Sequence, residues 1–180
     1  MNVISADLIS LFANAIRDNW NFRALSDFGG SSFTYRDVGE KVLRIHALFV
    51  KSGIRKGDKI ALFGKNSSDW GIIYISTVTY GAVIVPILPD FKPADVHHIV
   101  THSDSVLLFA EDSLFSGLDP DAMPLLRQIL KIQDSSVLYE RRGSPVEENS
   151  PKSEILRLRN QNSRKHRREV SNDSYISSSL

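Results

Sequence analysis

The 180-residue chain contains no cysteine. This absence excludes disulfides, thiolate nucleophiles and zinc sites with cysteine ligands, and it fits a reducing, cytoplasmic location. A strong excess of charge is also missing, because 22 Lys and Arg residues against 21 Asp and Glu residues leave a formal net charge of +1. A charge this small creates no general attraction for nucleic acid. The 42% of hydrophobic residues suffices for one domain with a real core.

Long uninterrupted hydrophobic runs are scarce. Residues 71–89 carry no charged side chain and approach the length of a membrane-spanning helix. Gly81 and Pro86 would each weaken a continuous helix in this stretch. The pattern therefore predicts a helix followed by a strand, and no transmembrane segment.

Recognisable catalytic signatures are absent as well: the sequence has no G-x-G-x-x-G, Walker A or G-x-S-x-G pattern. Gly29-Gly30-Ser31-Ser32 precedes a β-type run, which indicates a hairpin turn and not a phosphate loop. His98 and His102 have the spacing of two zinc ligands on a helix, but no third ligand is evident, and a polar helix face is the favoured interpretation. We predict no catalytic, cofactor-binding or metal-binding residue in this chain.

Residues 1–33 predict a helix and a hairpin. Apolar residues recur at spacings of three and four on one helix face: Leu8, Leu11, Phe12, Ala15 and Ile16. Two short strands, 23–27 and 31–33, flank a turn in which Gly29 and Gly30 would supply positive φ angles.

Residues 34–135 predict alternating helices and strands. Thr34 and Asp37 resemble a capping box that opens a helix ended by Gly53. Strands are expected at 60–63, 82–86, 105–110 and 129–132, and further helices between residue 66 and Gly81, at 93–102 and at 121–128. This order predicts an α/β fold with a mainly parallel sheet flanked by helices. The strand runs do not alternate in polarity, which is typical of strands buried on both faces.

Residues 136–180 differ in composition. The stretch 150–170 holds seven Lys or Arg residues against two acidic residues, and apolar residues are few. This composition predicts a flexible, disordered basic tail. No aromatic residues are interleaved with the cluster at 164–168, so we expect a solvated tail and no nucleic-acid partner.

Four sequence pieces occur in a fixed order: Phe33–Val38, Ser52–Ala61, Asn66–Trp70 and Tyr80–Pro86. This series resembles the N-terminal subdomain of the adenylate-forming superfamily, which includes acyl-CoA synthetases, peptide-synthetase adenylation domains and luciferases. Asp37-Val38 stands where that family usually has Glu-Leu. Trp70 and the stretch 88–91 look most like the long-chain fatty acid–CoA ligase branch, and the resemblance fades after about residue 135.

The resemblance implies an acid–thiol ligase. Such an enzyme activates a carboxylate with ATP and Mg²⁺ to give an acyl-adenylate, and the CoA thiol then displaces AMP. The family's phosphate loop, metal-binding Glu, ribose-binding Asp and catalytic Lys are expected beyond this chain; Ser177–Leu180 lies near the loop's place but lacks its glycines and lysine. We therefore expect an incomplete subdomain that by itself is inactive and binds none of ATP, Mg²⁺ or CoA.

Two alternatives to an enzyme segment stay open: a non-catalytic binding module on the same scaffold, and the relic of a truncated gene. For the complete enzyme, the expected partners are a fatty acid, ATP and CoA, together with a missing C-terminal part of the chain. A half-built sheet exposes an edge and apolar faces, which predicts self-association of the chain alone.

Overall fold

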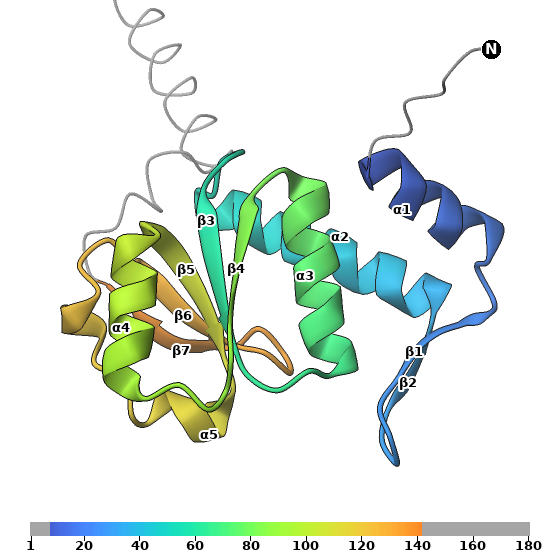
Figure 1. The fold of residues 1–180 in the computed structure, drawn as a ribbon. Coiled ribbons are helices and arrows are strands. Elements are labelled where there is room, and N and C mark those ends of the chain that lie inside the picture. Colours follow the sequence, from blue (N-terminus) through green and yellow to red (C-terminus); the bar gives the residue numbers. More distant parts are fainter. Residues whose placement is uncertain (1–7, 142–180) are drawn as a thin grey trace, which may run out of the picture. The chain divides into compact units, whose positions relative to one another are not determined.

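The computed structural model describes residues 8–141, in which helices and strands largely alternate (Figure 1). The predicted basic tail from residue 142 onward lies outside the described residues. The helices are α1 (Leu8–Asp18), α2 (Tyr35–Lys51), α3 (Ser68–Tyr80), α4 (Pro93–His102), α5 (Asp112–Phe115) and the 3-10 helix η1 (Pro120–Ala122). The strands are β1 (Arg23–Ser26), β2 (Ser32–Thr34), β3 (Lys59–Phe63), β4 (Val83–Ile87), β5 (Ser105–Ala110), β6 (Gln128–Lys131) and β7 (Val137–Glu140).

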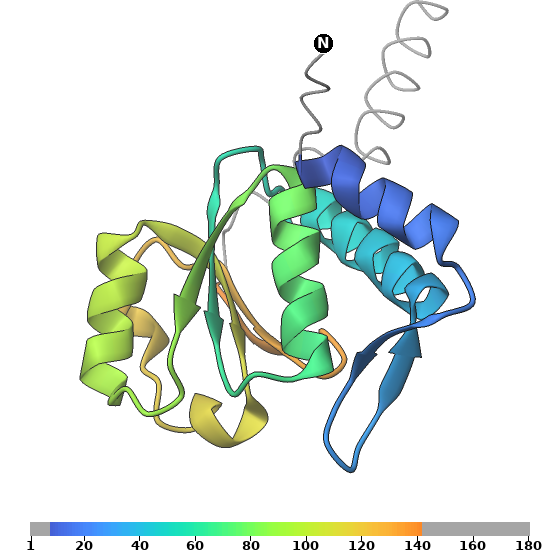
Figure 2. The same ribbon diagram turned by 45° about the vertical axis from the view of Figure 1, so that its right-hand side comes forward.

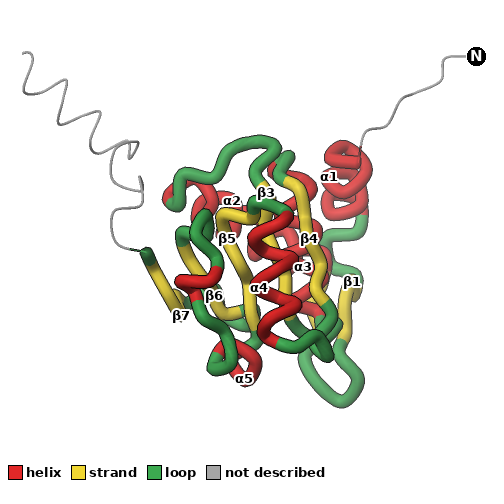
Figure 3. Tube along the Cα trace, turned by 60° about the vertical axis from the view of Figure 1, so that its left-hand side comes forward, coloured by secondary structure: helices red, strands yellow, loops and turns green. Residues whose placement is uncertain are grey.

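The main sheet has the strand order β4-β3-β5-β6-β7. Strands β4, β3, β5 and β6 are parallel, and β7 pairs with β6 in the antiparallel sense. The predicted α/β class and mainly parallel sheet are therefore confirmed. Figure 3 shows β7 and β4 at opposite edges of this sheet.

Strand β7 corrects the predicted boundary at residue 135. The composition places residues 137–140 in the flexible tail, whereas the structure shows that they extend the sheet. The short run Val137-Leu138-Tyr139 forms a hairpin with β6 through a turn in which Ser135 adopts a φ of 59°. A strand this short carries little signal next to a polar turn, so its pairing with β6 decides the conformation.

Both faces of the sheet are covered (Figure 2). Ile60 and Leu62 of β3 pack in a core with α2 and α3. Ala61 and Phe63 point the other way, into a core with α4. This double burial explains why the apolar strand runs do not alternate with polar residues.

The predicted capping box at the start of α2 is confirmed. The Thr34 hydroxyl accepts a hydrogen bond from the Asp37 backbone N–H at 3.2 Å, and the Asp37 carboxylate accepts one from the Thr34 backbone N–H at 2.8 Å. Gly53 follows the C-cap Ser52 with a φ of 66°. The apolar positions predicted for this helix are all buried: Val38, Val42, Ile45 and Phe49.

Helix α3 begins at Ser68, within the range predicted between residue 66 and Gly81. Ser67 is the N-cap, and its hydroxyl accepts a hydrogen bond from the Trp70 backbone N–H at 3.1 Å. Ser68 lies inside the helix, where its backbone N–H donates to the Asp27 carboxylate. As predicted, Gly81 ends the helix, with a left-handed φ of 87°.

Strand β4 is less buried than expected, because among the described strands it pairs with β3 alone and forms an edge. Pro86 does not end this strand; it stays in register with Leu62. The Val83 backbone N–H donates to the Asp58 carbonyl on the β3 side. The backbone N–H groups of successive strand residues point toward opposite neighbours, so position 86 points away from β3. The missing N–H of Pro86 therefore breaks no hydrogen bond with β3.

The N-terminal helix and hairpin form as predicted, with two adjustments. The Asp27 backbone N–H donates to the Ser31 carbonyl, so the hairpin loop is longer than two residues, and Gly29 has a positive φ while Gly30 does not. In α1, the predicted apolar face is only partly covered, because Leu8 and Leu11 remain exposed.

The predicted helix at 121–128 is wrong, because Pro124 cannot occupy a helix interior. The 3-10 helix η1 occupies residues 120–122 instead. The short helix α5, at residues 112–115, is a further element that the sequence pattern does not predict. Residues 71–89 fold as the predicted helix and strand, α3 and β4. Among the described residues, no helix combines the length and apolarity needed to cross a membrane.

Candidate functional site at the carboxyl edge of the sheet

The sheet has a topological switch point at β3. The crossover through α3 leads from β3 to β4 on one side, whereas β5 pairs with β3 on the other side. In open α/β sheets, ligands bind in the crevice outside the carboxyl ends of strands at such a point. The segment Gly64–Ser67 follows β3 there, and Glu111 follows β5 with its backbone N–H donating to the Phe63 carbonyl at 3.1 Å.

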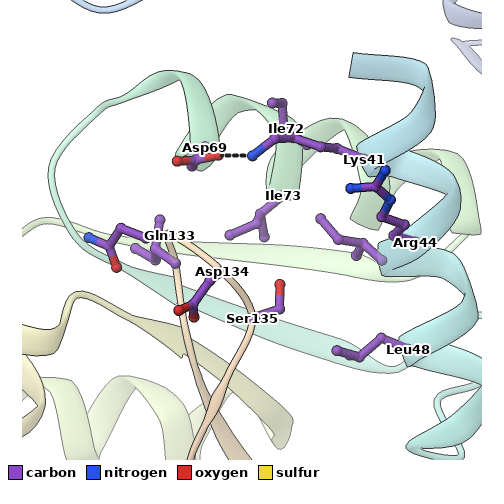
Figure 4. A pocket seen from close by; sticks show the side chains of 11 residues that line it. Lys41, Arg44, Leu48, Asp69, Ile72, Ile73, Gln133, Asp134 and Ser135 are labelled. Carbon is purple, nitrogen blue, oxygen red and sulfur yellow. Dashed lines mark hydrogen bonds and ion pairs between the residues drawn. The ribbon is translucent and has the colours of Figure 1, made fainter. Parts of the chain in front are cut away.

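A pocket of about 450 Å³ opens between α2, α3 and the β6–β7 turn (Figure 4). Aliphatic side chains from both helices and from the residue after β6 line it, together with a polar rim. The apolar lining residues are Ile45, Leu48, Ile72, Ile73 and Ile132. The polar ones are Lys41, Arg44, Asp69, Gln133, Asp134 and Ser135.

Most of the charged side chains on the rim of the pocket form an ion pair or hydrogen bonds with neighbouring groups. The Lys41 ammonium lies 2.7 Å from the Asp69 carboxylate and also 4.7 Å from the centre of the Phe33 ring. Hydrogen bonds from the Ser136 hydroxyl and backbone N–H hold the pKa of the Asp134 carboxyl below its usual range. The pocket can therefore accept an apolar group with a polar end. Its lining contains no cysteine or histidine that could act as a nucleophile or base.

Acidic residues outnumber basic ones around the carboxyl ends of the strands. Lys131 is paired with Asp112 at 3.0 Å, while Asp90, Glu111 and Asp134 add further negative charge. The exposed cations in these segments are Lys65, which follows β3, and Lys92, which follows β4. A triphosphate needs cations or amide donors around it, and this edge of residues 8–141 supplies few of them.

No set of three histidine, aspartate or glutamate side chains within residues 8–141 is placed to hold a metal ion. His98 and His102 lie exposed on α4 with stacked rings 5.7 Å apart. His97 has a structural contact, in which its Nε2 accepts a hydrogen bond from the Asp119 backbone N–H at 2.9 Å.

Sequence reasoning did not identify the pocket. Lys41 and Asp69 lie on different helices, 28 positions apart, and the β6–β7 turn comes from a third region. None of these segments carries a local motif for binding, so only the packing of α2 against α3 brings them together.

Comparison with known proteins agrees with the fold. The family model described as AMP-binding enzyme matches residues 12–175, and thus extends beyond residue 135, where the resemblance was expected to fade. The structure is similar to that of the anthranilate CoA ligase AuaEII in complex with anthranoyl-AMP. The TM-score is 0.65 at 19% identity, with 68% of this chain and 24% of that chain covered.

Two curated relatives show the range of the similarity. One component of the plipastatin synthase of Bacillus subtilis is 34% identical over 91 residues, covering 51% of this chain and 4% of the relative. The medium/long-chain-fatty-acid–CoA/3-oxocholest-4-en-26-oate–CoA ligase of Mycobacterium marinum is 26% identical over 167 residues, covering 88% of this chain and 30% of the relative. The chain thus spans less than a third of the length of either relative. The family match over most of the sequence shows that this chain belongs to the AMP-binding enzymes, the adenylate-forming family.

Proposed function

We propose that this chain forms the first α/β layers of an ATP-dependent long-chain fatty acid–CoA ligase. The observation that carries the proposal is the family match over residues 12–175, on a parallel sheet with a switch point at β3. The Mycobacterium marinum relative, whose name includes medium/long-chain-fatty-acid–CoA ligase, supports the fatty acid substrate class. The proposal includes a helix-and-hairpin lead-in at residues 1–33, an AMP-binding-type subdomain from residue 34, and a cytoplasmic location.

The reaction proposed for the complete enzyme has two steps. A carboxylate oxygen of the fatty acid attacks the α-phosphorus of ATP, which forms an acyl-adenylate and releases pyrophosphate. The CoA sulfur then attacks the acyl carbon, forms the thioester and releases AMP. In this scheme, the described residues hold one wall of the site through the buried strands β3 and β5, and the remaining contacts to phosphate come from elsewhere.

The excess of acidic residues at the carboxyl edge supports a further part of the proposal. A triphosphate brought to this edge would meet Asp90, Glu111 and Asp134, which outnumber the exposed cations Lys65 and Lys92. The 180-residue chain alone is therefore proposed to bind ATP weakly and to catalyse no adenylation.

ATP–pyrophosphate exchange tests the proposal directly. The protein expressed from its own gene should exchange labelled pyrophosphate into ATP when a long-chain fatty acid is present, and it should form acyl-CoA when CoA is added. Aryl acids and amino acids serve as competing substrates in parallel reactions. The 180-residue chain by itself, at the same concentration, should give no exchange.

The results separate the parts of the proposal. Exchange that depends on an aryl or amino acid and not on fatty acids would refute the substrate class. Absence of exchange with every acid would refute adenylation and favour a non-catalytic binding module. Exchange by the 180-residue chain alone would refute the proposed need for further residues.

A further inference from the structure

The turn between α2 and β3 concentrates positive charge. Residues 51–59 contain four cations and a single carboxylate, Asp58. We call the four cations the basic turn: Lys51, Arg55, Lys56 and Lys59. None of them forms an ion pair within residues 8–141. Asp104 precedes the neighbouring strand β5. When it is counted together with Asp58, the four cations still give this region an excess of two positive charges.

The basic turn is held firmly against the amino edge of the sheet. The Gly57 backbone N–H donates to the Gly81 carbonyl at 2.8 Å, and the Asp58 carbonyl accepts from the Val83 backbone N–H at 2.8 Å. In Figure 1, this turn lies at the same end of the sheet as the connection from α3 to β4. The cations are thus presented by a hydrogen-bonded turn, opposite to the acidic carboxyl edge.

An exposed aliphatic row leads along α2 to the basic turn. Leu43, Ala47 and Val50 occupy positions i, i+4 and i+7 and therefore share one face of the helix. Leu43 is 69% exposed and Val50 is 56% exposed. We call these three residues the aliphatic stripe.

We propose that the aliphatic stripe and the basic turn together dock on the surface of an anionic lipid bilayer. Clusters of Lys and Arg are attracted to anionic headgroups, and neighbouring aliphatic side chains enter the boundary between headgroups and acyl chains. Single-stranded nucleic acid is usually bound by cations combined with aromatic stacking platforms, and neither the stripe nor the basic turn contains an aromatic residue. We call the aliphatic stripe and the basic turn together the corner. The corner therefore fits a lipid surface better than a nucleic acid.

The orientation follows from the charge distribution. An anionic surface attracts the basic turn and repels the carboxyl edge, where Asp90, Glu111 and Asp134 lie. The carboxyl edge then faces the aqueous side. This docking does not depend on the proposed ligase activity, although it would bring such an enzyme close to a source of fatty acid.

Vesicle co-sedimentation of the 180-residue chain tests the proposal. The chain should bind vesicles in which a third of the lipid is phosphatidylserine, should bind vesicles of pure phosphatidylcholine much less, and should be released by salt. The variant Lys51→Gln with Arg55→Gln should lower the partition coefficient by about fivefold for each charge removed. Neither side chain forms an ion pair in the described residues, so this variant should keep its circular dichroism spectrum.

A matched control removes the same charge elsewhere. The variant Lys65→Gln with Lys92→Gln alters two exposed lysines outside the corner and should bind nearly as well as the unchanged chain. All variants retain the basic sequence at 164–168, so its contribution is constant. A second variant, Val50→Ser, keeps the charge and should also weaken binding.

Three results would overturn the proposal. Equal losses in the two double variants would mean that net charge, and not this corner, attracts lipid. An unchanged affinity in the variant at Lys51 and Arg55 would place lipid binding elsewhere. Tighter binding to a single-stranded RNA oligonucleotide than to the anionic vesicles, lost in that same variant, would identify a nucleic-acid surface instead.

Discussion

Gly64 lies so close to Ile132 that a methyl group on Gly64 would stand 2.6 Å from Ile132 Cδ1. Glu111 Cγ would be the next atom, at 3.3 Å. The contact packs the end of β3 against the residue that follows β6, at the carboxyl edge of the sheet. Ile132 is buried and also lines the pocket, so its terminal methyl group must shift within that packed wall to admit the new methyl group. The Gly64→Ala variant should therefore lose about 1–3 kcal/mol of unfolding free energy, measured by urea denaturation.

Gly71 provides the matched control for this substitution. It lies inside α3, and a methyl group there would meet Leu25 Cδ1 at an ordinary 3.8 Å. Alanine favours a helix over glycine, so Gly71→Ala should raise the unfolding free energy by about 0.5–1 kcal/mol. If both variants changed stability in the same direction, the close contact at Gly64 would not be the cause.

The capping box of α2 should make stability depend on pH. Hydrogen bonds from the Thr34 hydroxyl and backbone N–H lower the pKa of the Asp37 carboxyl from its ordinary 3.8. A carboxyl whose pKa is lower in the folded state stabilises the fold above its unfolded pKa, and this contribution disappears as the pH falls through the folded pKa. Unfolding measured below pH 4 should show this loss, and Asp37→Asn should reduce it.

Thr34→Ala removes the hydroxyl group that forms the capping box of α2 together with Asp37. Loss of a threonine N-cap costs about 1 kcal/mol of unfolding free energy at neutral pH. Asp134, whose pKa is also lowered, retains its own pH dependence in both variants. A pH profile of Asp37→Asn identical to that of the unchanged chain would contradict the role of the capping box.

The sequence predicts those parts of the fold that depend on local interactions. Thr34 and Asp37 form a capping box within four residues, and Gly53 and Gly81 occupy left-handed positions at helix ends. Such features need no distant partner. Strand β7 and the exposure of β4 depend instead on which strands become neighbours, and the pattern of a four- or five-residue strand does not encode that choice.

The candidate site is less predictable for a similar reason. Lys41, Asp69 and Asp134 each lie in a segment with no binding motif, and they meet only after α2, α3 and the β6–β7 turn have packed. The family resemblance supplied the fold, but it offered no functional residue within this chain. A pocket of this kind is formed by tertiary packing and is not marked by a local motif.

A chain of polar side chains, in which Ser52 and Gln128 are buried and Glu140 is exposed, links the end of α2 to the sheet and supports a third prediction. The Ser52 hydroxyl donates to Gln128 Oε1 at 2.8 Å, and Gln128 Nε2 donates to the Glu140 carboxylate at 2.6 Å. Ser52→Ala leaves a buried amide oxygen unpaired, which should cost about 1–3 kcal/mol of unfolding free energy. Combining it with Gln128→Leu should cost less than the sum of the two single changes. Strict additivity in this double-mutant cycle would mean that the Ser52–Gln128 bond contributes nothing.

Pro86 occupies the outward side of the edge strand β4 and supports the last prediction. Because Val83 directs its N–H toward β3, the alternation along the strand directs position 86 outward, where proline offers no donor to a second chain. An exposed edge otherwise serves as a template for pairing between chains. Pro86→Val restores the donor and should shift the 180-residue chain toward dimers and larger species, measured by sedimentation velocity over a range of concentrations. Pro89→Val, beyond the end of the strand, should leave the distribution unchanged, and equal association of the two variants would show that β4 is not the associating edge.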